Sequence, residues 1–332
     1  WKMTTRQMHQ TLKRIRLTAA ATLCCGHLLA ASIPEPDTYI LERTVGYRLG
    51  NPPRRVEWKA PEPIQTNLVV YSAVTPACDP TLMQRVADHF QVLGPIKQFT
   101  DREAFGFGYL IEERDPTNRM VLRDVAYIAT SGAFRYGTAD RGERWDLKNH
   151  KPLVRGVPGK AEAQAMAIGL LPLLGISTND LHYQPDGSLL SWFGEEAVSY
   201  NDRVTKERKR VVIQRSVSFC QRIPLGGTPS SVGDGGQVRF TFVSEGKVTG
   251  IEWFFRKLEV AGQAKPKSRQ DIIKDIKAGR FWTWHQKIPG SLTVTHCELT
   301  YPQGNSGTYQ RYVWPFYMVT GTAQEGRVVT LF

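Results

Sequence analysis

The sequence predicts an α+β fold in which antiparallel sheets are each crossed by a helix. Three segments have the apolar spacing and the caps of helices, and each is followed by several strand-like runs. Turn signals such as Asp186-Gly187 separate neighbouring runs and favour antiparallel pairing. Strand-like runs outnumber helical ones, so we expect helices packed on the faces of curled sheets.

Residues 1–32 have the composition of a signal peptide. A cationic stretch precedes an apolar segment over residues 17–31, and Ala30-Ala31-Ser32 then provides the small residues that a signal peptidase recognises. An apolar run of roughly 15 residues is short for a bilayer, which takes about 20, and a retained membrane anchor is the alternative to cleavage. We therefore expect an exported protein, periplasmic or extracellular, that begins near Ile33.

The charge of the chain excludes a strongly basic nucleic-acid binder. The net charge is +12, and residues 1–32 contain five basic and no acidic residues, so the mature chain would carry +7. That excess is modest and predicts mild attraction to anionic surfaces. No CxxC motif and no His pair at helical spacing is present, so we expect no metal site and no cofactor.

Three cysteines remain after the leader, at Cys78, Cys220 and Cys297. In an oxidising compartment they could form one disulfide and leave one free thiol, or all three could be buried thiols. Their irregular spacing, in a chain large enough to fold without bridges, favours buried thiols.

The elements of the first half follow from local signals. Residues 33–62 contain five prolines and predict an extended N-terminal arm. A first α+β unit over residues 63–158 follows, with a helix that starts at Asp79-Pro80 and stops at Gly94. Its predicted strands are residues 67–74, 104–112, 120–128 and 133–136.

Two further units repeat this order. In the second, residues 159–262, a helix starts near Lys160 and Pro172 ends or kinks it. Its predicted strands are residues 181–184, 188–193, 210–222, 237–243 and 248–258. In the third, residues 263–332, Ser268 to Asp271 resembles a capping box that opens a helix ending at Gly279. Its predicted strands are residues 290–301, 308–319 and 326–331.

The C-terminal unit resembles a known class of exported domains. A capped helix over 268–279, the run LTVTHCELTY over 292–301 and the run QRYVWPFYMVTG over 310–321 are similar to the end of PepSY-like and cystatin-like domains. The resemblance implies a helix packed across an antiparallel sheet, a role in binding or inhibiting other exported proteins or in sensing, and no catalytic residues. A Gly/Ser-rich loop over 226–236 and the cluster at 282–285 depart from it.

Two clusters are candidate binding sites. Trp282, Trp284 and His285 form either a core wedge or an exposed stacking platform suited to a sugar or an extended peptide, and the core interpretation is favoured. The run from Arg203 to Arg210 has five cations in eight residues, which ends in Arg208, Lys209 and Arg210. It predicts a charged hairpin tip that either protects a strand edge or attracts anionic polymers or lipid headgroups.

Three other motifs do not support catalysis. The 226–236 loop lacks the Gly-Lys-Ser/Thr ending of a phosphate cradle. His296 and Cys297 are neighbours on a predicted strand, so their side chains point to opposite faces. The adjacent carboxylates of Glu195 and Glu196 are expected to be solvated, because two glycosidase carboxyls must face each other across the sugar.

These observations predict a non-catalytic exported binding or regulatory module of the cell envelope and not an enzyme. The expected partner is another exported protein or an anionic envelope polymer, with no nucleic acid involved. The alternative is an envelope hydrolase or carbohydrate-binding protein that uses the Trp282–His285 region with Glu195 or Glu196.

Overall fold

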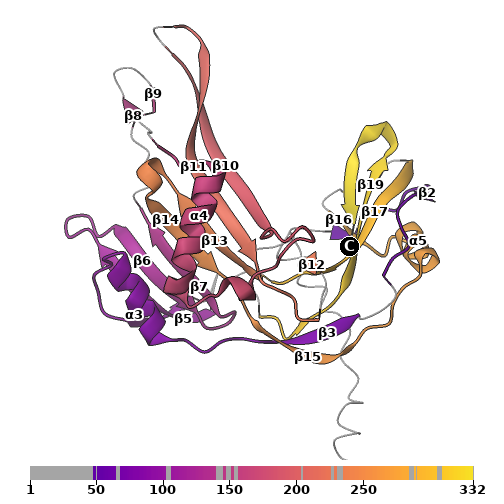
Figure 1. Ribbon diagram of the computed structural model, residues 1–332, viewed down its shortest axis with the longest axis horizontal. Coiled ribbons are helices and arrows are strands. Elements are labelled where there is room, and N and C mark those ends of the chain that lie inside the picture. Colours follow the sequence, from indigo (N-terminus) through magenta and orange to yellow (C-terminus); the bar gives the residue numbers. More distant parts are fainter. Residues whose placement is uncertain are drawn as a thin grey trace, which may run out of the picture.

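The computed structural model describes residues 48–49, 51–64, 68–101, 106–139, 145–146, 151–152, 156–202, 205–225, 228–229, 235–283, 288, 290–304 and 309–331. In this part of the chain, strands dominate and three α-helices accompany five sheets. Figure 1 shows a large lobe around one broad sheet, a smaller lobe of C-terminal strands, and the strands β3 and β15 running between them. No helix in the described ranges is long and apolar enough to cross a membrane.

An antiparallel eight-stranded sheet forms the large lobe. Its order across the sheet is β10 (Ser191–Asn201), β11 (Arg208–Cys220), β13 (Gln237–Phe242), β14 (Val248–Trp253), β7 (Ala133–Thr138), β6 (Val121–Ile128), β5 (Gly106–Arg114) and β4 (Lys97–Asp101). The sheet has two halves, each a helix followed by four antiparallel strands, and β7 pairs with β14 where they join. The residues predicted as the first and second units therefore share one sheet.

Two helices cover one face of this sheet. Helix α3 (Pro80–His89) begins where the Asp79 carboxylate accepts a hydrogen bond from the Thr81 amide, and it buries Leu82 and Val86. Helix α4 (Lys160–Leu170) buries the small side chains of Ala163 and Ala167 and continues as the 3₁₀ turn η1 (Leu171–Leu174). Both helices pack against apolar side chains of β5, β6, β7, β11, β13 and β14 in one core. The opposite face of the sheet lies outside this core.

A second sheet forms the smaller lobe. Its path is β12 (Thr228–Pro229), β17 (Ser291–Tyr301), β19 (Phe316–Ala323) and β20 (Val328–Leu331), and β2 (Arg55–Trp58) pairs in parallel with β17. Helix α5 (Arg269–Lys277) packs Ile272 and Ile276 into the core of this lobe. The strand β1 (Arg48–Leu49) pairs with β16 (Trp282–Thr283). The predicted N-terminal arm thus contributes two strands, β1 and β2.

The remaining elements are short or link the lobes. A three-stranded sheet contains β15 (Lys257–Gln263), β3 (Val69–Val74) and β18 (Tyr312–Val313), so segments from all three predicted units meet there. The pair β8 (Trp145–Asp146) and β9 (Lys151–Pro152) forms a separate two-stranded sheet. Single 3₁₀ turns are η2 (Thr178–Asp180), η3 (Ser244–Gly246) and η4 (Gln324–Gly326).

The predicted fold class is wrong. The described chain is mostly β, and helices do not cross each sheet, because α3 and α4 both lie on the eight-stranded sheet. Side-chain alternation predicts which face of a strand is buried, but it does not specify which strand pairs with which. The pairing of β7 with β14 merges two predicted sheets into one.

Several strand boundaries also differ from expectation. The predicted strand over 181–184 contains only isolated bridges, Leu181 to Gln221 and Tyr183 to Leu189. The predicted strand over 248–258 divides into β14 and β15, which belong to different sheets. The predicted strand over 308–319 divides into β18 and β19 around Pro315, which has no amide hydrogen for a sheet.

Candidate functional site

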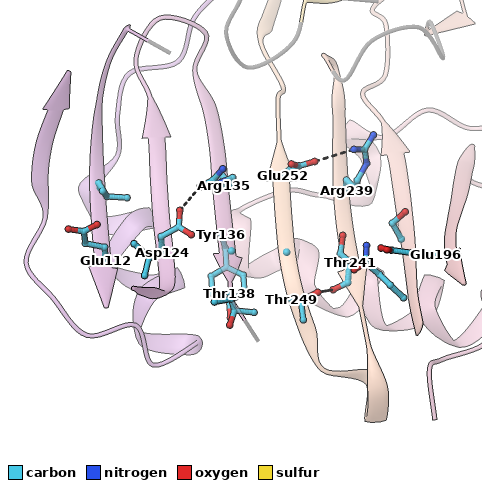
Figure 2. Close-up of a pocket in the computed structure, with 17 residues that line it drawn as sticks. Glu112, Asp124, Arg135, Tyr136, Thr138, Glu196, Arg239, Thr241, Thr249 and Glu252 are labelled. Atoms are coloured by element: carbon cyan, nitrogen blue, oxygen red, sulfur yellow. Dashed lines mark hydrogen bonds and ion pairs between the residues drawn. The ribbon is translucent and has the colours of Figure 1, made fainter. Parts of the chain in front are cut away.

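The open face of the eight-stranded sheet contains a trough of about 760 Å³. Its lining residues come from β5, β6, β7, β14, β13, β11 and β10, so it extends across almost the whole sheet. Figure 2 shows polar side chains from these strands standing on the same face. Helices α3 and α4 pack against the other face of the sheet.

A continuous line of cross-strand partners forms the floor of the trough. The line runs through Ser216, Thr241, Gly250, Gly137, Asp124 and Glu112. Directly paired residues in an antiparallel sheet point to the same face. Because the two central members are glycines, no side chain rises from the middle of the floor, and this leaves the hollow.

The next line of partners carries charges of alternating sign. Arg239 pairs with Glu252, and Glu252 pairs with Arg135, on three adjacent strands. The Arg239 guanidinium lies 3.2 Å from a Glu252 carboxylate oxygen, and Arg135 lies 2.7 Å from Asp124 in the first line. Figure 2 shows both ion pairs. A ligand in the trough would meet acidic and basic groups in turn.

The two ends of the trough are acidic. Glu112 is bound by Arg114 at 2.7 Å, and this hydrogen bond holds the pKa of the Glu112 carboxyl below its ordinary value. At the other end, Glu196 is exposed and has no ion pair within the described ranges. The lining contains four carboxylates and two guanidinium groups, so its formal charge is negative in a chain that is positive overall.

The trough is suited to a polar ligand. Its volume falls in the range of small-ligand sites, about 300–1,000 Å³, but such sites are mostly apolar and this lining is mostly polar. One aromatic residue lines it, Tyr136, whose side chain is buried and stacked on Phe90 in the helix-covered core. Among the described residues, no group of three His, Cys, Asp or Glu side chains is arranged to hold a metal ion.

The predicted aromatic cluster is only partly visible. Trp282 lies on β16 and is 9% exposed, which agrees with the core interpretation for this residue. Trp284 and His285 lie outside the described residues. The burial of Trp282 favours the core interpretation over an exposed stacking platform at this residue.

The predicted basic run lies on the hairpin of β10 and β11, which Figure 1 shows projecting beyond the rest of the sheet. Arg208 and Arg210 are exposed. Lys209 is held by the Asp202 carboxylate at 2.6 Å, and Arg210 lies 4.0 Å from Glu195. Arg203 lies outside the described residues.

The acidic pair is divided between the two faces of β10. Glu195 forms an ion pair at 2.8 Å with Arg215, and Arg215 also donates to the carbonyl of Pro158. Glu196, its neighbour, lines the trough on the other face. Both carboxylates belong to a different sheet from Trp282.

The cysteines are free thiols in the described structure. Cys220 is buried, whereas Cys78 and Cys297 are half-buried. The prediction of a buried thiol is therefore confirmed for Cys220 and only partly met by Cys78 and Cys297. His296 is exposed beside Glu298 at 3.4 Å. Most of the 226–236 loop lies outside the described residues.

Apart from Glu196, the residues of the trough were not singled out in the sequence. The alternation in β13 does indicate that Arg239 and Thr241 lie on a wet face. In their strands, Asp124, Arg135 and Glu252 have only small or apolar residues two positions away on either side, so no alternating charge pattern in the sequence marks them. Their meeting depends on the register of β6, β7 and β14, which the sequence alone does not specify.

Comparison with known proteins gives no family for this chain. No family model matches it, and no curated protein matches it. A solved structure of an uncharacterised protein from Eubacterium rectale ATCC 33656 aligns over 84% of this chain and 87% of its own, with a TM-score of 0.44 and 8% identity. The resemblance to PepSY-like and cystatin-like domains remains a prediction from the sequence.

Proposed function

We propose that this protein is a non-catalytic binding module of the cell envelope, which holds an extended polar segment of another exported protein in the trough. The observation that carries the proposal is the glycine-floored trough with its alternating charges, on the face of the sheet opposite α3 and α4. A sheet backed by a helical layer is a rigid platform, and rigid platforms bind with little loss of conformational entropy.

The arrangement of charges favours a peptide over a sugar or a small apolar molecule. Asp124, Arg135, Glu252 and Arg239 already neutralise one another, and a peptide with charges of both signs could exchange these pairs for its own. Sites for small organic ligands are lined mainly by apolar and aromatic side chains. Tyr136 is the one aromatic residue of the lining, and its ring is buried against Phe90 in the core.

The carboxylates of the trough are better suited to binding than to proton transfer. A general acid needs a pKa near the working pH, whereas Arg114 lowers the pKa of Glu112. Asp124 and Glu252 are each engaged by an arginine. We therefore expect the bound segment to be released unchanged.

A selection from a displayed library of short random peptides tests the proposal. We expect the wild-type chain to enrich peptides with charges of both signs. A selected peptide, labelled for fluorescence anisotropy, should lose at least about tenfold in affinity, or 1.4 kcal/mol, for Gly250→Leu, which fills the floor. Gly169→Ala is the matched control, because Gly169 is exposed on α4 with nothing near its Cβ position.

A charge exchange gives a sharper test. The double variant Asp124→Arg with Arg135→Asp keeps the ion pair and the net charge but reverses the order of the charges, so folding should persist while binding is lost. A selected peptide that binds Gly250→Leu and the exchanged variant as tightly as wild type would place the ligand elsewhere. Cleavage of the bound peptide, seen by mass spectrometry, would contradict a non-catalytic role.

A further inference from the structure

The segment around α5 concentrates positive charge on the smaller lobe. Residues 265–280 contain six basic residues and two acidic ones, a net +4 in a chain whose total is +12. The basic residues are Lys265, Lys267, Arg269, Lys274, Lys277 and Arg280. Figure 1 shows α5 beside β2 at the outer side of this lobe, away from the eight-stranded sheet.

The helix presents part of this charge to solvent. Ile272 and Ile276 are buried, so positions on the opposite side of the helix, including Lys274 and Lys277, face outward. Both lysines are exposed, as is Lys265 just before the helix. None of the three has a carboxylate within ion-pair distance in the described part of the chain.

The acidic residues of the segment are already engaged. Asp271 accepts hydrogen bonds from Ser268 in the capping box of α5. Asp275 binds Lys267 at 2.7 Å and Arg280 at 2.6 Å. The ammonium groups of Lys265, Lys274 and Lys277 can therefore meet anionic groups outside the protein.

An exposed apolar side chain lies beside this basic segment. Ile64 is 51% exposed, and its carbonyl accepts a hydrogen bond of 2.8 Å from the Tyr317 hydroxyl. The same hydroxyl accepts a hydrogen bond of 3.2 Å from the Lys267 amide. Basic residues with an adjacent apolar residue are the combination that binds at the boundary of lipid headgroups and acyl chains.

The smaller lobe also contains β1 and β2, the first two strands of the described chain. The first described strand, β1, pairs with β16, which begins a few residues after α5 ends. The apolar residues 17–31 precede β1 in the sequence. If those residues are retained as an anchor, the smaller lobe is the first part of the described fold that follows them in the sequence.

We propose that α5, with Lys265 and Ile64, is a docking surface for an anionic lipid bilayer. The lysines would contact phosphate headgroups, and the Ile64 side chain would enter the headgroup boundary. A soluble polyanion would use the charges but not Ile64, and this separates the two kinds of partner. The surface is on a different sheet from the trough, so the proposal does not depend on the peptide-binding function.

Vesicle binding by the full chain tests the proposal. We expect tighter binding to vesicles of equimolar phosphatidylcholine and phosphatidylglycerol than to vesicles of phosphatidylcholine alone. Binding to the phosphatidylcholine vesicles measures any contribution of the apolar N-terminal segment. Replacing Lys265, Lys274 and Lys277 by Gln should reduce this preference on the order of 100-fold, since a lysine near an anionic surface contributes about 1 kcal/mol. Salt at 1 M, where the Debye length is about 3 Å, should remove it.

Two further variants make the result specific. The triple variant Arg119→Gln, Lys160→Gln and Arg222→Gln removes the same charge from exposed positions of the large lobe, and it should keep the preference. Ile64→Ser should weaken binding several-fold at constant charge. Equal affinity of the wild-type chain for both vesicles, or equal loss in both triple variants, would overturn the proposal. An Ile64→Ser variant with the same vesicle affinity as wild type would also overturn the proposal. In that case, displacement of the protein from the vesicles by poly-L-glutamate would indicate a polymer partner.

Discussion

Gly137 and Gly250 lie directly opposite each other on β7 and β14, the two central strands of the eight-stranded sheet. These strands are also the last strands of the two halves, so the glycine pair marks the line along which the halves join. Both glycines line the trough. The same pairing therefore builds the sheet and hollows its open face.

Gly250→Ala should leave the fold intact. A Cβ atom at Gly250 would meet its nearest neighbour, the Thr241 Cβ, at 3.6 Å, an ordinary contact. Glycine in a strand costs conformational entropy, so alanine should change the free energy of unfolding by no more than about 1 kcal/mol, in the stabilising direction. Urea denaturation measures this. A loss of more than about 1 kcal/mol would mean that the floor tolerates no side chain, and Gly250→Leu could not then test binding.

Gly235→Ala should destabilise the protein, in contrast to Gly250→Ala. A Cβ atom at Gly235 would overlap the backbone carbonyl oxygens of Gln303 and Gly304, and backbone atoms cannot rotate away as a side chain can. Arg256, which is 1% exposed, donates to the same Gly304 carbonyl at 3.0 Å. We expect a loss of about 1–3 kcal/mol, typical of overpacking, in urea denaturation. Stability equal to that of Gly169→Ala would contradict this close approach.

Local signals in the sequence predicted the starts of the helices correctly. The Asp79 side chain accepts from the Thr81 amide at 2.9 Å, and Ser268 accepts from the Asp271 amide at 3.2 Å, as the capping residues indicate. A cap depends on residues within one turn, so one sequence contains all the information needed. The alternation of β13 was predictable for the same reason.

Long-range pairing could not be predicted from one sequence. Arg135 and Glu252 become neighbours only through the register of β7 and β14, which are separated along the chain by β10, β11 and β13 of the same sheet. The strand β2 was missed because its four residues lie among the prolines of the predicted arm and pair with β17, from the other end of the chain. Both the trough and the true fold class depend on such pairings.

Cys297 should react slowly with iodoacetamide in the folded protein. Burial, with a smaller contribution from Glu298, raises the pKa of this thiol from 9.0 to about 11. The thiolate is the reactive form, so the alkylation rate should rise with an inflection near pH 11 in the folded chain and near pH 9 in urea. Cys220, which is buried, is the internal control and should react only on unfolding.

The same shift links Cys297 to stability. A thiol whose pKa is higher in the folded state favours folding below pH 9, and this contribution is lost as the pH rises from 9 toward 11. Cys297→Ala should therefore unfold with a shallower pH dependence over this range. An inflection near pH 9 in the folded protein would show instead that the thiol is open to solvent.

Trp282→Ala should unfold more easily than wild type because Trp282 is buried. Its side chain is 9% exposed on β16, and the adjacent Phe281 and Thr283 are also buried. Truncating a buried tryptophan typically costs about 3–5 kcal/mol, and Trp282→Phe should cost less because it leaves a smaller cavity. Urea denaturation of the two variants measures the difference. If Trp282 instead formed a stacking platform for a ligand, both variants would keep the stability of the wild type, and the carbohydrate-binding alternative would regain support.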